Sequence, residues 1–61
     1  MRVFTQAELN RMSRAELMAL QQKILQILPD MADGSAEFRT AYANLQATRK
    51  AIEIRFTLEF H

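Results

Sequence analysis

The amino-acid sequence predicts an all-α protein in which a short N-terminal helix precedes an antiparallel helical hairpin. Three observations support this fold class. A helix-start motif occurs twice near the N-terminus, a strong helical pattern of apolar residues follows its second copy, and a Pro–Gly segment separates that pattern from a second long helix. We expect a single domain over residues 1–61, because a chain of this length rarely holds two.

The two helix-start motifs are capping boxes that lie eight residues apart. In a capping box, a Ser or Thr hydroxyl accepts a hydrogen bond from a backbone N–H three residues later, and the Glu at that position reaches back to the N–H of the cap. Thr5 with Glu8 forms the first box, and Ser13 with Glu16 forms the second. They predict a short helix over residues 6–12, a bend and then a new helix. The alternative is one continuous helix that ignores the second cap.

The main helix is predicted over Arg14–Leu28 and carries a wide apolar band. Its apolar residues recur in steps of three and four, as one face of an α-helix requires. At about 100° per residue the band covers about half of the circumference, more than the stripe of about 100° on an ordinary surface helix. We therefore expect packing on two sides, by the hairpin partner and by a second subunit. The band consists of Leu17, Met18, Leu20, Ile24, Leu25, Ile27, Leu28 and Met31.

The connection between the two long helices is predicted over Pro29–Ser35. Pro29 ends the main helix, because proline lacks a backbone N–H and disfavours helical geometry in the residue before it. It can also begin a short helical turn. Gly34, the only glycine, is expected to adopt a left-handed conformation. Ser35 is expected to cap the last helix, which is predicted over Ala36–Arg55.

The last helix is expected to turn its large apolar residues toward the core. Arg49 falls in the middle of this face, so its stem should pack there while its head reaches water or pairs with Glu53. The alternative is a contact across an interface, where arginine is enriched. The face consists of Phe38, Tyr42, Leu45, Ile52 and Phe56.

The end of the chain allows two interpretations. Residues 52–60 alternate strictly between apolar and polar, which is the period of a β-strand. No turn residue separates them from the preceding helix, however. We favour a helix that ends at about Arg55. In the strand alternative, residues 1–4 or the same segment of another subunit would pair with it.

Self-association into a four-helix-type dimer is expected, because the chain has little interior for its apolar content. Hydrophobic residues make up 49% of a 61-residue sequence without cysteine, so disulfides cannot supply stability. In size and two-helix layout the chain resembles small homodimeric four-helix-bundle regulators, without a shared motif that would transfer a functional residue. The residues expected in the core, or in a dimer or partner interface wherever the folded chain leaves them exposed, are Met18, Leu25, Phe38, Tyr42, Arg49 and Phe56.

The sequence offers few residues for catalysis or for binding a metal or cofactor. It contains no cysteine, its one histidine is His61, and it has no glycine-rich phosphate loop. The hydroxyl residues at the helix starts are better explained as caps, and Asp30 and Asp33 as turn residues. We therefore predict no catalytic residue, no metal site and no cofactor.

Nucleic-acid binding is the alternative function. The net charge is only +1, and acidic residues are interspersed among the basic ones, whereas a phosphate-binding surface concentrates one sign. A mixed pattern of this kind is more typical of a solvated face. The residues that would contact nucleic acid are Arg11, Arg14, Arg39 and Lys50.

The function predicted from the sequence is that of a small non-enzymatic protein-interaction module. It would act as a homodimeric regulator that binds and modulates another protein, for example by sequestering a transcriptional regulator. We expect no membrane span, because no apolar run approaches about 20 residues, and no signal peptide. A cytoplasmic location is therefore expected. The alternative is a dimeric nucleic-acid-binding regulator that uses the basic residues of the last helix.

Overall fold

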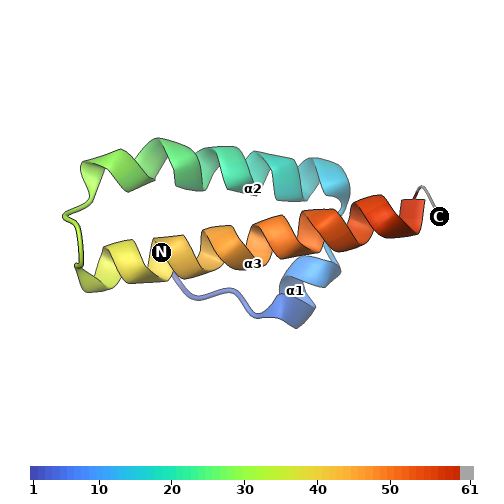
Figure 1. The fold of residues 1–61 in the computed structure, drawn as a ribbon, viewed down its shortest axis with the longest axis horizontal. Coiled ribbons are helices and arrows are strands. Elements are labelled where there is room, and N and C mark those ends of the chain that lie inside the picture. The colour runs from blue at the N-terminus through green and yellow to red at the C-terminus, as the bar shows by residue number, and fades with distance from the viewer. Residues whose placement is uncertain (60–61) are drawn as a thin grey trace.

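The computed structural model describes residues 1–59, and this part of the chain is helical without any strand. The elements are α1 (Gln6–Asn10), α2 (Arg14–Ile27), a 3₁₀ turn η1 (Leu28–Asp30) and α3 (Ala36–Glu59). The α2 and α3 helices lie side by side and antiparallel, and α1 packs on α3 near the end where α2 begins (Figure 1). The predicted fold class, a short helix followed by a helical hairpin, is confirmed.

Both predicted capping boxes are present, and they separate α1 from α2. The Thr5 hydroxyl accepts from the Glu8 N–H at 3.1 Å, and the Glu8 carboxylate accepts from the Thr5 N–H at 3.1 Å. Ser13 and Glu16 exchange the same two bonds, at 3.1 and 3.0 Å. The alternative of one continuous helix is therefore wrong. The first helix ends at Asn10, two residues earlier than predicted.

The connection between the long helices also follows the prediction. The α2 helix ends at Ile27, one residue early, and Pro29 lies in the short 3₁₀ turn that follows. Gly34 has a φ of 78°, which is the left-handed conformation that a residue with a side chain rarely adopts. The Ser35 hydroxyl accepts from the Phe38 N–H at 3.1 Å and caps α3.

The last helix is longer than predicted. It continues through Arg55 to Glu59, so both the predicted end and the strand interpretation are wrong for residues 52–59. Phe60, the last residue of the alternating stretch, lies outside the described residues. No proline or glycine interrupts the backbone ladder here, and an ion pair of 3.7 Å joins the carboxylate of Glu59 to the Arg14 guanidinium at the start of α2. The backbone of α3 therefore stays helical here, although the side chains alternate with the two-residue period of a strand.

The buried face of α3 is not the large apolar face that the sequence suggested. Tyr42 and Phe56 are exposed, so their expected place in the core is wrong. The buried residues recur at steps of three and four, and most of them are small, which lets the neighbouring helices approach closely. They are Ala41, Asn44, Leu45, Thr48 and Ala51. The aromatic residues lie about a quarter of a turn away.

The buried side chain of Asn44 attaches the N-terminal segment to α3. Its amide nitrogen donates to the carbonyl oxygen of Arg2 at 2.7 Å, and its oxygen accepts from the backbone N–H of Phe4 at 2.9 Å. One turn later, the buried Thr48 hydroxyl donates to the Asn44 carbonyl at 2.6 Å. Both polar side chains in the core are thus satisfied, as burial requires.

The α1 helix is held against α3 by a small apolar cluster and by two polar contacts. Leu9 is fully buried and packs with Leu17 of α2 and Ala51 of α3. The Gln6 amide donates to the Ala47 carbonyl at 3.2 Å, and a guanidinium nitrogen of Arg55 donates to the Asn10 carbonyl at 3.4 Å. The α3 helix is therefore the central element, because it contacts both α2 and α1.

Within residues 1–59, two carboxyl groups have shifted pKa values, and both belong to capping boxes. The pKa of Glu8 falls from 4.5 to about 2, first because the Arg2 guanidinium donates to it at 2.6 Å and second because the Thr5 N–H does. The pKa of Glu16 is lowered by the backbone N–H of Ser13 and then by its hydroxyl. The ionised carboxylates therefore stabilise the starts of α1 and α2.

Replacing Asn44 should detach the N-terminal segment. We expect Asn44→Ala to lower the free energy of unfolding by about 1–3 kcal/mol, because it leaves a backbone N–H and a backbone carbonyl without their partner. Urea denaturation followed by circular dichroism measures this change. Gln46→Ala is the matched control, since Gln46 is exposed on the same helix. An equal effect of the two substitutions would contradict the role assigned to Asn44.

Acid should weaken the attachment of α1. Because the folded pKa of Glu8, about 2, lies below its ordinary value of 4.5, its stabilising contribution is complete above pH 4.5 and disappears as the pH falls toward 2. A Glu8→Gln variant should show a smaller loss of stability over this interval, although Glu16 still contributes. Stability curves of both proteins measured from pH 6 to pH 2 check this; parallel curves would refute it.

Candidate protein-interaction surface

One long side of the α2–α3 hairpin is not covered by any other segment of the described chain. Each of its residues Met18, Leu25, Tyr42 and Arg49 directly follows a buried residue. In two antiparallel helices, the residue that directly follows a contact residue points to the same side of the pair, whichever of the two helices it belongs to. We call this side the open face. It carries all six residues predicted as core or interface, which are Met18, Leu25, Phe38, Tyr42, Arg49 and Phe56.

The opposite side of the hairpin is covered near the end where α2 begins. There α1 packs on Ala47 and Ala51, and the connection from α1 to α2 passes behind α3 in the view of Figure 1.

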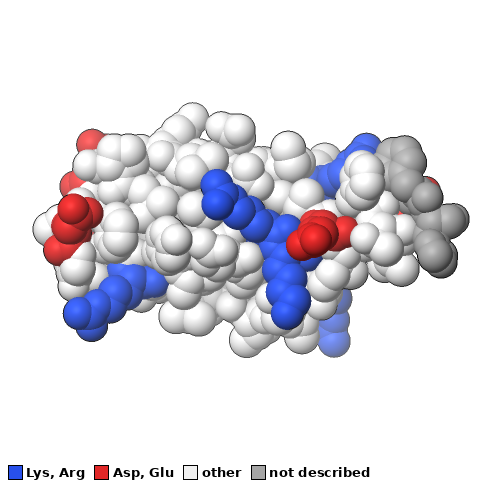
Figure 2. All heavy atoms as spheres, in the orientation of Figure 1, with Lys and Arg blue, Asp and Glu red and all other residues white. Residues whose placement is uncertain are grey.

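Figure 2 shows the molecule from the same direction, with one group of basic side chains over the middle of α3, an acidic group beside it, and other charges toward the ends. Most of the surface between them carries no charged side chain.

Large apolar side chains on the open face reach solvent. The exposed fraction is 44% for Met18, 37% for Leu25, 48% for Tyr42 and 57% for Phe56. Phe38 is half-buried and stacks on Tyr42, with ring centroids 6.2 Å apart and ring planes 13° apart. Such a stack presents one rigid aromatic surface, of the kind that is enriched where proteins bind each other.

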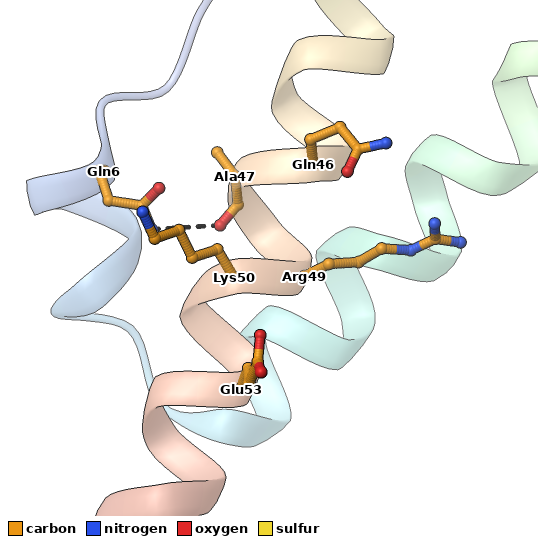
Figure 3. A pocket seen from close by; sticks show the side chains of 6 residues that line it. All are labelled: Gln6, Gln46, Ala47, Arg49, Lys50 and Glu53. Atoms are coloured by element: carbon orange, nitrogen blue, oxygen red, sulfur yellow. Dashed lines mark hydrogen bonds between the residues drawn. The ribbon is translucent and has the colours of Figure 1, made fainter.

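Arg49 lies between these apolar residues without an intramolecular partner. It is exposed, and among residues 1–59 its guanidinium takes part in no hydrogen bond or ion pair. The expected pairing with Glu53 is therefore absent from the structure. Figure 3 shows Arg49 and Lys50 leaving α3 in opposite directions, Arg49 toward α2 and Lys50 toward Gln6 of α1. Arg49 thus belongs to the open face, and Lys50 does not.

A shallow open groove runs over the outer side of α3 toward α1 (Figure 3). Its charged residues are Arg49, Lys50 and Glu53, so cations and an anion alternate along it. Neutral Gln6, Gln46 and Ala47 complete its lining. This mixture concentrates no single sign of charge and does not describe a site for one ionic ligand.

A second exposed apolar area lies near the end of α3. Ile54 is 36% exposed and Leu58 is 70% exposed, and they are one turn apart on the flank opposite Phe56. With Glu53 and Thr57 they line a small, mainly apolar hollow. The sequence prediction did not include this pair, although Ile54 and Leu58 were part of the alternating stretch.

The basic residues considered for nucleic-acid binding are spread over the molecule. Arg11 follows α1, and Arg14 begins α2, where it pairs with Glu59. Arg39 and Lys50 are exposed on α3, three turns apart along the same face. The structure therefore does not bring the four side chains into one patch.

Asn44 and Thr48 are the buried residues that sequence reasoning missed. They continue the row of Ala41, Leu45 and Ala51 with steps of three and four, and that regular spacing was the available signal. Their role is structural, since their polar groups bond to the backbone.

Within residues 1–59 there is no cluster of three or more acidic or histidine side chains that could bind a metal ion. None of the helices described there has both the length and the apolar character that spanning a bilayer requires.

Comparisons were made with protein-family models, with curated proteins and with solved structures. None of the three finds a match to this chain.

Proposed function

We propose that this chain is a small, cytoplasmic, non-enzymatic protein-interaction module that binds and regulates another protein. In this proposal two copies associate through the open face into a four-helix-type dimer. The observation that carries it is the open face itself, on which Met18, Leu25, Tyr42 and Phe56 are exposed together. Exposed apolar residues gathered on one side are a common mark of protein-binding surfaces.

The size of the chain is compatible with a dimer interface on this face. A stable interface of standard size buries about 800 Å² on each partner, which is less than a fifth of the 4392 Å² accessible surface of the chain. The open face includes residues of both long helices over most of their length. Burial of its aromatic and aliphatic side chains would supply the main stabilisation of the dimer.

A dimer formed in this way leaves the second apolar area free for the regulated protein. Ile54 and Leu58 lie on the flank of α3 opposite the open face, beside the hollow that they help to line. An apolar side chain or helix of another protein fits a surface of this kind. Sequestering a transcriptional regulator is one example of the regulation we propose.

Sedimentation equilibrium tests the dimer. We expect the wild-type chain to sediment as a dimer at micromolar concentration. Phe56→Ser should weaken this association by about tenfold or more, because exposed aromatic residues dominate interfaces of this kind. Leu58→Ser is the matched control, since Leu58 is exposed on the opposite flank of the same helix. A stable, well-folded wild-type monomer at micromolar concentration would refute the dimer.

A pull-down from the native cell, identified by mass spectrometry after nuclease treatment, tests the regulatory part. We expect a protein that is recovered with the wild type and with Val3→Ser but lost with Leu58→Ser; Val3 is exposed elsewhere on the chain. If no protein depends on Leu58, this part is wrong. Binding that disappears with nuclease and falls steeply with salt would instead support the nucleic-acid alternative, through Arg39 and Lys50.

A further inference from the structure

We propose that the two copies meet with their α3 helices antiparallel, in a register fixed by two reciprocal ion pairs. Arg49 of each copy binds Glu53 of the other, about a two-fold axis at the level of Ala51. This inference rests on the proposed dimer and adds to it the orientation of the two hairpins and the residues that determine it. A second copy of this chain is therefore the occupant of the open face.

The first support is the state of the two charges within one chain. Arg49 and Glu53 are both exposed, and neither side chain forms an ion pair or hydrogen bond in the part of the chain that the structure describes. They are four residues apart, so about 6 Å separates them along the helix axis. An Arg that precedes a Glu by one turn is the less favourable order for pairing within a helix. Both groups therefore remain available to a partner.

The second support is symmetry. Antiparallel pairing about a two-fold axis places each residue opposite the one at the same distance on the other side of the axis. With the axis level with Ala51, which lies midway between Arg49 and Glu53, each charge faces its opposite in the partner. Moving the axis by two residues, to the level of Arg49, would bring the two arginines together, and moving it by two residues to the level of Glu53 would bring the two glutamates together. The charge pattern thus complements itself in one antiparallel register.

The third support is the apolar surface that this register covers. Leu17 and Ala51 pack in one cluster, so Met18, which follows Leu17, lies at the level of the axis. The two Met18 side chains would therefore meet near the centre of the interface. Phe56 is five residues beyond the axis and would lie opposite Gln46 of the partner, between its Tyr42 and its Arg49. The most exposed aromatic residue of the open face then lies against the partner's Tyr42 ring and the stem of its Arg49.

Charge-swapped variants test the register. In an Arg49→Glu chain both positions are acidic, and in a Glu53→Arg chain both are basic. Each variant alone should lose its dimer, with association weakened by about tenfold or more, because like charges face each other twice. An equimolar mixture should regain the dimer as a heterodimer, because both pairs are then complementary. Sedimentation and native mass spectrometry measure the species, and circular dichroism verifies that each variant is folded.

Lys50→Glu is the matched control, because it makes the same change of charge on the neighbouring residue, which points away from the open face (Figure 3). It should remain a dimer. A wild-type dimer whose association is unchanged by both swaps would overturn this register and leave the proposed dimer standing. Swapped chains that stay monomeric when mixed would also overturn it. A wild type that is monomeric at micromolar concentration would overturn the dimer together with this inference.

Discussion

The buried amide of Asn44 is the constraint on which the arrangement of the molecule depends. A buried amide is tolerated only where both its donor and its acceptor find partners. Here the partners are the backbone of Arg2 and of Phe4, so residues 2–4 must run alongside α3 in one position. The capping box at Thr5 then starts α1 directly beside α3. One side chain thus decides which side of the hairpin is covered and which side stays open.

The parts of this fold that the sequence predicts correctly are those determined by local signals. The two capping boxes specify where α1 and α2 begin, because every group in a box lies within four consecutive residues. The same holds for the turn at Gly34 and for the cap at Ser35. The residues predicted for an interface lie on one side of the hairpin, because the three- and four-residue period of the helices is a local property as well. Their role as an interface stays a prediction.

The buried face of α3 could not be predicted in this way. Large aromatic residues form the stronger apolar pattern, but the packed row consists of alanines, one leucine, Asn44 and Thr48. The partner of Asn44 lies 40 residues away in the sequence, so no local pattern reports that its amide is satisfied. The end of α3 was missed for a related reason. An alternating pattern predicts a strand only where a neighbouring strand can pair with it, and the described chain offers none.

Covering one side of the hairpin with α1 has a consequence for the size of the assembly. A hairpin with apolar residues on both of its sides could bind one neighbour on each and extend into an open fibre. Leu9 and the N-terminal segment occupy part of one side, so the open face is the side on which apolar residues of both long helices are exposed. In the dimer that we propose, association through the open face closes after two chains. In this proposal, the short first helix limits further association because it occupies part of the other side of the hairpin.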